Sequence, residues 1–239
     1  MLKRLFVCFF LASAFLCGCA SPVSSVEATT DTTVKSTTFP APFSLEDAVF
    51  LGDSNIAHLS SYGLLPEEQI WTGSQRYLTL EPDVCHKYIV YPDTGTEMTV
   101  CDAVSLKKPK FLVITLGTDG ALGLDREGVR LSYVSLIESI RNASSDTKIL
   151  IQSIFPIRPA ILNGRFDSVD AVNQKFDLVN LWLAEIADEY GIVYLDTRSV
   201  LTDKHGMLRE EYNTDHLDGY HLNRAGLEAV LEYILENAK

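Results

Sequence analysis

The sequence predicts an α/β protein, a three-layer α/β/α sandwich built around a mainly parallel β-sheet. Two observations lead to this fold class. Several short runs are apolar throughout, as expected of parallel strands that helices cover on both faces. Between these runs lie amphipathic segments in which apolar residues recur every three or four positions. Strands that alternate with helices in this way form a sheet sandwiched between two helical layers.

Four strands are predicted for the main sheet, and they span residues 48–51, 110–117, 148–156 and 192–196. A further segment, 88–100, has the pattern of a hairpin around an Asp-Thr-Gly turn and is expected outside the main sheet. Three helices are predicted from apolar stripes, which consist of Val129, Tyr133, Ile137 and Ile140; of Phe176, Val179, Leu183, Ile186 and Tyr190; and of Leu227, Val230, Leu231 and Ile234. Residues 44–47 are expected to form a short capped turn.

The N-terminus has the pattern of a targeting segment. Lys3 and Arg4 precede an apolar run, 5–16, that is too short to span a bilayer comfortably. The run ends in Leu-Cys-Gly-Cys, which resembles a bacterial lipobox with Cys19 as the lipid acceptor. Residues 1–19 are therefore predicted to be a lipoprotein signal peptide that anchors the protein at the extracytoplasmic face of a membrane. The alternative is an ordinary signal peptide, which would release a secreted protein.

The rest of the chain divides into a linker and one folded domain. Residues 20–42 are rich in Thr, Ser, Pro and Ala and are predicted to be a disordered linker. Residues 43–239 are long enough for one domain with a substantial core, and a composition of 46% hydrophobic and 22% charged residues is typical of a globular protein. The net charge of -12 argues against nucleic acid as a partner, because phosphate binding requires a basic face.

The cysteines leave one question open. Cys8, Cys17 and Cys19 lie in the predicted signal peptide, so that Cys85 and Cys101 remain in the domain. Export permits a disulfide between these two. Two buried free thiols are at least as consistent with the sequence, since it gives no distance between the two Cα atoms.

A candidate nucleophile lies where the first strand gives way to a helix. The stretch from Val49 to Leu59 contains Gly-Asp-Ser, with Ser54 at this junction. Asp119 follows the second predicted strand, and ligands of open α/β sheets bind at the carboxyl ends of the strands. Asp and Ser are also common in turns and helix caps, so the position of Ser54 alone does not establish a catalytic role.

A base and an orienting carboxylate for Ser54 are present before the last helix. The gap of three residues puts Asp218 and His221 on one turn, where the carboxylate can reach one imidazole nitrogen and leave the other for the serine. A solvated loop histidine is the alternative interpretation. The backbone N–H groups of Ser54 and Gly73 are candidate donors to an oxyanion, although a lone glycine is more often simply part of a turn.

Taken together, these motifs resemble the SGNH hydrolase family, also called GDSL esterases and lipases, over almost the whole domain. The family's Gly-Asp-Ser block falls on residues 52–54, its Gly-x-Asn-Asp block on 117–120, and its Asp-x-x-His block on Asp218 and His221. The resemblance implies a flavodoxin-like fold with a Ser-His-Asp triad. The mechanism that this resemblance implies requires no metal or organic cofactor.

The same resemblance implies roles for Ser54 as the nucleophile and for Gly73 as an oxyanion donor. The chain departs from the family where Asp119 replaces an asparagine, since an ionised carboxylate accepts hydrogen bonds and donates none. Three explanations of this departure are open. Asp119 is protonated in a desolvated pocket and acts as a donor itself. Alternatively, Thr118 or the Gly120 N–H replaces it as donor, or the site is weakened or inactive. Retained activity is favoured, because all three triad residues are present.

The remaining polar residues are given structural interpretations. Asp215 and His216 stand beside the predicted triad residues and suggest a metal cluster, but no second group of ligands is evident and no metal is predicted. The three histidines outside this segment, His58, His86 and His205, are interpreted as surface or packing residues.

The expected function is that of an exported serine esterase that hydrolyses short acyl esters. The family resemblance and the predicted export favour O-acetyl groups on a cell-envelope or environmental polysaccharide as substrate. One alternative is a non-catalytic carbohydrate- or envelope-binding lipoprotein on a decayed esterase scaffold, which Asp119 favours. Another is an O-acyltransferase that uses the same triad.

Overall fold

The computed structural model describes residues 42–160, 168–214 and 218–239, all within one compact unit that spans Ser36–Lys239. The predicted signal peptide, the predicted lipid acceptor Cys19 and all but the last residue of the predicted linker lie outside these residues. Asp215 and His216 also lie outside them. None of the helices that the structure describes is both long and apolar enough to cross a membrane.

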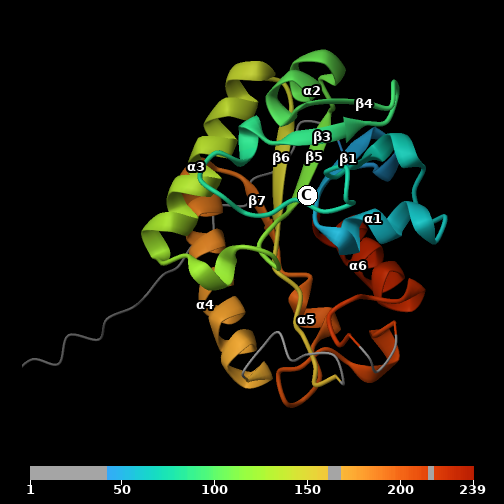
Figure 1. Cartoon of the computed structure of the whole chain (residues 1–239), viewed down its shortest axis with the longest axis vertical. Coiled ribbons are helices and arrows are strands. Elements are labelled where there is room, and N and C mark those ends of the chain that lie inside the picture. The colour runs from blue at the N-terminus through green and yellow to red at the C-terminus, as the bar shows by residue number, and fades with distance from the viewer. Residues whose placement is uncertain (1–41, 161–167, 215–217) are drawn as a thin grey trace, which may run out of the picture. The chain divides into compact units, whose positions relative to one another are not determined.

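The main sheet has five parallel strands in the order β2-β1-β5-β6-β7 (Figure 1). The strands are β1 (Ala48–Gly52), β2 (Ile70–Trp71), β5 (Phe111–Thr115), β6 (Lys148–Gln152) and β7 (Val193–Leu195). The fold class and all four predicted main-sheet strands are confirmed. Edge strand β2 was not predicted, because two residues are too few to show a periodic pattern.

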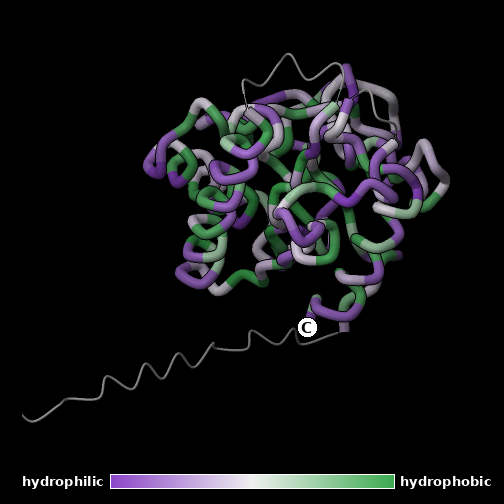
Figure 2. The backbone as a smooth tube through the Cα atoms, turned by 90° about the horizontal axis from the view of Figure 1, so that it is seen from below, coloured by the Kyte–Doolittle hydropathy of each residue, from purple (hydrophilic) through white to green (hydrophobic). Residues whose placement is uncertain are grey.

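Helices cover both faces of the sheet, which gives the predicted three layers. Figure 1 shows α3 (Arg126–Ala143) and α4 (Val169–Tyr190) on one side, with α1 (Ser54–Ser61) and α6 (Arg224–Asn237) on the other. Strand residues alternate between the layers: Val49 and Leu51 face the core that contains α3 and α4, whereas Ala48 and Phe50 face the core that contains α1 and α6. Hydrophobic and hydrophilic residues alternate along the outer helices, as their amphipathic patterns predict (Figure 2).

The remaining elements are shorter. β3 (Tyr88–Tyr91) and β4 (Thr96–Thr99) form the predicted hairpin, which is a separate two-stranded sheet. Two short helices are α2 (Val100–Lys107) and α5 (Arg198–Leu201), and the 3₁₀ turns are η1 (Leu45–Asp47), η2 (Glu67–Gln69), η3 (Val84–His86), η4 (Ala121–Gly123) and η5 (Glu210–Tyr212). Ser44 caps η1 by accepting the N–H of Glu46, as predicted for this segment.

A disulfide settles the question that the cysteines left open. Cys85 in η3 and Cys101 in α2 are bonded, with their Cα atoms 5.7 Å apart. The interpretation as two free thiols is therefore wrong for this structure. The bond links the turn before the hairpin to the helix after it, and it closes a loop that contains both β3 and β4.

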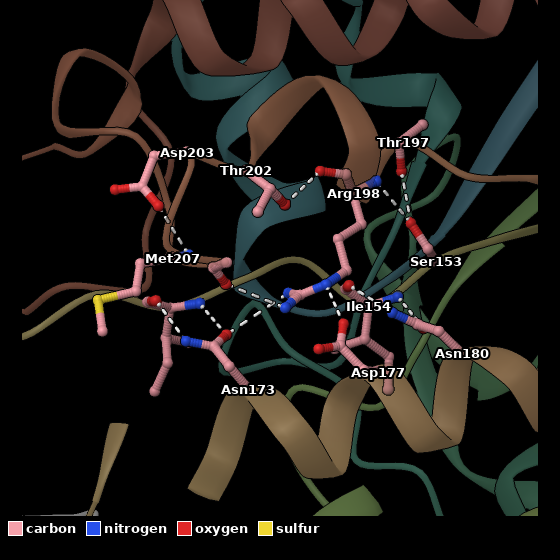
Figure 3. Close-up of polar contacts among 12 residues, drawn as sticks. Ser153, Ile154, Asn173, Asp177, Asn180, Thr197, Arg198, Thr202, Asp203 and Met207 are labelled. Atoms are coloured by element: carbon pink, nitrogen blue, oxygen red, sulfur yellow. Dashed lines mark hydrogen bonds and ion pairs between the residues drawn. The ribbon is translucent and has the colours of Figure 1, made fainter. Parts of the chain in front are cut away.

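A buried arginine anchors the chain after β7. The Nε atom of Arg198 lies 2.5 Å from the Asp177 carboxylate on α4, and its Nη2 atom donates to the carbonyl of Gly206 at 3.2 Å (Figure 3). Its backbone N–H donates to the Ser153 hydroxyl at 2.8 Å. These contacts join α4, the end of β6 and the segment after α5, and so hold the part of the chain that leads toward Asp218.

Candidate active site

Ser54 is the first residue of α1 and directly follows the turn that ends β1. Asp53 caps the helix, since its Oδ1 atom accepts the N–H of Asn55 at 3.0 Å. Gly52 allows β1 to end close to β5, because a Cβ atom there would lie 2.6 Å from the carbonyl oxygen of Thr115. The serine hydroxyl is therefore presented at a helix N-terminus and at the carboxyl edge of the sheet.

Ser54, His221 and Asp218 form a continuous chain of hydrogen bonds. The Nε2 atom of His221 lies 2.8 Å from Ser54 Oγ, and its Nδ1 atom lies 2.8 Å from Asp218 Oδ2. All three side chains are half-buried. With the imidazole neutral and Nδ1 protonated, Nε2 is free to accept the serine proton, which is the arrangement that a general base requires.

The carboxylate of Asp218 is held by its own turn. Its Oδ1 atom accepts the backbone N–H groups of Tyr220 at 3.0 Å and His221 at 3.1 Å. Burial by itself would raise the pKa of Asp218, but these bonds and the His221 side chain outweigh burial and lower it. Asp218 is thus suited to remain charged and to stabilise an imidazolium at His221.

Asn55 is a site residue that the sequence interpretation missed. Its fully buried side chain accepts the N–H of Leu222 at 2.8 Å and donates to the carbonyl of Tyr220 at 3.3 Å. These two bonds fasten the start of α1 to the segment that carries His221. The only sequence signal was a polar residue directly after the candidate nucleophile, where the burial of its side chain was not evident.

Gly73 does not have the free N–H that an oxyanion donor needs. Its N–H donates to the carbonyl of Tyr77 at 3.2 Å, and the Arg76 N–H donates back to the Gly73 carbonyl at 2.7 Å. A Cβ atom at position 73 would lie 2.6 Å from the Tyr77 carbonyl oxygen. The closure of its own turn explains both the glycine and the present use of its N–H, and the role of Gly73 as an oxyanion donor stays a prediction.

Asp119 lies in the loop after β5, between two glycines in the left-handed region of φ, Gly117 at 138° and Gly120 at 105°. Its backbone carbonyl accepts the N–H of Leu80 at 3.0 Å. Burial raises the pKa of Asp53, and the charge of Asp119 raises it further, while the Thr118 side chain, the Asn55 N–H and His221 oppose this rise. The structure therefore brings Asp119 close to the start of α1, and its role toward an oxyanion stays a prediction.

His58 lies against the imidazole of His221 rather than at the open surface. Its ring centroid is 4.8 Å from that of His221, and its side chain is half-buried.

The described residues contain no group of three or more His, Cys, Asp or Glu side chains that is arranged to hold a metal ion.

A parallel α/β sheet with a hydrogen-bonded Ser-His-Asp set at its carboxyl edge has the geometry of an acyl hydrolase. The chain belongs to the GDSL-like lipase/acylhydrolase family, whose family model matches residues 50–229, and this is the SGNH hydrolase family that the sequence motifs resemble. The family supports an ester-hydrolysing enzyme. No curated protein sequence matches the chain.

Solved structures share the fold at low sequence identity. A protein from Streptococcus pneumonia, provisionally described as a platelet activating factor, is similar with a TM-score of 0.55 and 20% identity over 80% of this chain and 82% of the other. A provisional acylhydrolase from Bacteroides fragilis has a TM-score of 0.50 and 16% identity over 90% and 99%. The periplasmic domain of a lipopolysaccharide acetyltransferase from Salmonella ser. Paratyphi A has a TM-score of 0.51 and 16% identity over 80% and 83%.

Proposed function

We propose that this protein is a serine esterase that removes short acyl groups, O-acetyl groups foremost, from carbohydrate through an acyl-enzyme. The observation that carries the proposal is the hydrogen-bonded chain from Ser54 through His221 to Asp218. Membership of an acylhydrolase family supports the reaction class. The preference for acetylated glycans rests on the family resemblance and the predicted export.

The proposed reaction has two halves, formation and hydrolysis of the acyl-enzyme, and both use the whole triad. Ser54 Oγ attacks the ester carbonyl carbon while His221 Nε2 takes its proton, and Asp218 stabilises the resulting imidazolium. The tetrahedral intermediate collapses as the bond to the alcohol oxygen breaks, and His221 returns the proton to that oxygen. Water then attacks the acyl-enzyme with His221 again as base, which releases the carboxylic acid and restores Ser54. The Ser54 N–H at the start of α1 is a candidate oxyanion donor.

The test is hydrolysis of p-nitrophenyl acetate and butyrate, and release of acetate from an acetylated polysaccharide, by wild type and Ser54→Ala. Turnover that is lost in Ser54→Ala supports the proposal, and faster reaction of acetate than of butyrate supports a short acyl group. Equal rates for the two proteins would overturn the nucleophile. Transfer of the acyl group to an added alcohol in preference to water would indicate an acyltransferase.

Asp119 favours a second candidate, a non-catalytic envelope- or carbohydrate-binding protein on the same scaffold. A carboxylate beside a developing oxyanion would repel it, whereas the family pattern has an amide donor there. The same assays decide between the two. A folded wild-type protein that cleaves neither the model esters nor the acetylated polysaccharide would support the binding protein and overturn the esterase.

We also propose that the protein is a lipoprotein anchored through Cys19 at the extracytoplasmic face of a membrane. The sequence Leu-Cys-Gly-Cys after a short apolar run supports this location. Cys19→Ser is expected to abolish incorporation of radioactive palmitate and to move the protein out of the membrane fraction. Cys17→Ser serves as the matched control and should retain both. Labelling that survives Cys19→Ser would overturn Cys19 as the acceptor.

A further inference from the structure

A second imidazole lies against the proposed catalytic histidine. His58 follows Ser54 by four residues on α1, so both side chains project from the same face of the helix. The ring centroids of His58 and His221 are 4.8 Å apart, and the ring planes are tilted by 48°. The His58 ring also meets the ring of Tyr62 edge-on, with the ring centroids 5.8 Å apart. The imidazole that must gain a proton during catalysis is thus packed against another group that can carry one.

The surroundings of His58 favour its neutral form. Its Nδ1 atom is buried and has no hydrogen-bond partner among the residues that the structure describes. A neutral imidazole has one N–H and one bare nitrogen, and a bare buried nitrogen costs less than a buried N–H without an acceptor. The proton of the neutral ring is therefore assigned to Nε2. A second proton, on Nδ1, would bury an unsatisfied donor.

The charges around His58 act in both directions. Burial, and then the charge of His221, lower the pKa of His58, whereas the backbone of Leu222 and the charge of Asp218 raise it. Arg76, which reaches over α1 to the carbonyl of Ala57 at 2.8 Å, adds to the lowering.

Two further titratable groups complete these surroundings. Glu67 pairs with Arg76 at 3.1 Å, and Tyr62 is the ring neighbour on α1 itself. The group that most directly couples to His58 is the ring in contact with it, that of His221.

We propose that His58 is a positioning residue of the esterase whose charge state gates the general base. When neutral, its ring packs against the His221 ring and supports it. When protonated, its charge opposes the imidazolium that His221 forms. This inference rests on the proposed function. It assigns to His58 a role beyond the surface or packing role that the sequence suggests.

The first test is the acid side of the pH profile of kcat/KM for p-nitrophenyl acetate. If His58 and His221 must both be neutral, kcat/KM of wild type falls about 100-fold per pH unit at the acid end. His58→Gln and His58→Phe, which remove the charge, should each fall only about tenfold per pH unit. His205→Gln is the control, because His205 is exposed, and it should keep the steep wild-type limb. Circular dichroism at each pH restricts the comparison to folded protein.

The second test does not depend on turnover. NMR titration of the histidine ring protons, with His58 assigned from His58→Gln, should show a higher titration midpoint for His58 in His221→Gln than in wild type. An unchanged midpoint, or an equally steep acid limb in His58→Gln and His58→Phe, would overturn the inference. Coupled titration in a protein that lacks Ser54-dependent hydrolysis would instead overturn the proposed function, and with it the catalytic role of His58.

Discussion

The Nε2 atom of His221 lies 2.8 Å from the hydroxyl oxygen of Ser54, although the two residues are 167 positions apart in the chain. The contact joins the start of α1 to the segment before α6, on the same side of the sheet. It places a base within reach of the serine proton, which is the geometric condition for nucleophilic catalysis.

Asp218→Asn is expected to lower kcat about 10⁴-fold, as loss of the orienting carboxylate does in other triads. The amide removes the charge that stabilises the imidazolium and permits the wrong tautomer of His221. Steady-state kinetics with p-nitrophenyl acetate measure the effect, with Asp83→Asn at an exposed site as control. A kcat within a few-fold of wild type would contradict the assignment of Asp218.

Asp119→Asn is expected to raise kcat, by up to about 10²-fold, because an amide can donate to the oxyanion where a carboxylate cannot. Asp119→Ala, which removes the negative charge without adding a donor, separates the two effects and should gain less. A fall in kcat for Asp119→Asn would show that the aspartic acid itself is needed at this position.

Asn55→Ala is expected to lower the free energy of unfolding by about 1–3 kcal/mol, because it removes the acceptor of the buried N–H of Leu222 and one hydrogen bond to the carbonyl of Tyr220. Displacement of His221 should also lower kcat, by up to about 10²-fold. Urea denaturation and steady-state kinetics measure the two effects. Asn237→Ala, at an exposed position near the end of α6, is the control, and equal stability of the two variants would contradict the prediction.

Asp53→Asn is expected to make the protein more stable at neutral pH than wild type. Burial raises the pKa of Asp53, so the folded state binds this proton more tightly than the unfolded chain does. The stability from this group is full below the unfolded pKa and is lost as the pH rises through the folded pKa. Asparagine retains the capping oxygen without the charge.

Urea denaturation of wild type and Asp53→Asn at several pH values measures this difference. The advantage of the variant should be largest at neutral pH and should shrink toward acid pH, where Asp53 is protonated in wild type. A constant difference, or an advantage that grows in acid, would contradict a raised pKa.

Loss of the bond between Cys85 and Cys101 is expected to lower the free energy of unfolding by about 2–4 kcal/mol, because the bond restricts the unfolded chain. Denaturation with and without a reductant measures this for wild type. The double variant Cys85→Ala/Cys101→Ala should be equally stable in both conditions. An insensitive wild type would contradict a stabilising disulfide.

The layers of the fold and the local parts of the site follow from the sequence alone. Apolar runs and helical stripes identify the buried faces, because burial on a strand or a helix follows its period directly. The same reasoning placed Ser54 at the end of a strand, and a spacing of three residues placed Asp218 within reach of His221. The strand β2 was missed because it is too short to show a period.

Which distant groups meet depends on the packing of the whole domain. The bond from His221 to Ser54, the link from Asn55 to Leu222 and the contact of His58 with His221 all depend on how α1 and the segment before α6 pack on one face of the sheet. Such contacts leave no periodic trace in the sequence, because they join residues whose separation along the chain bears no relation to their separation in space.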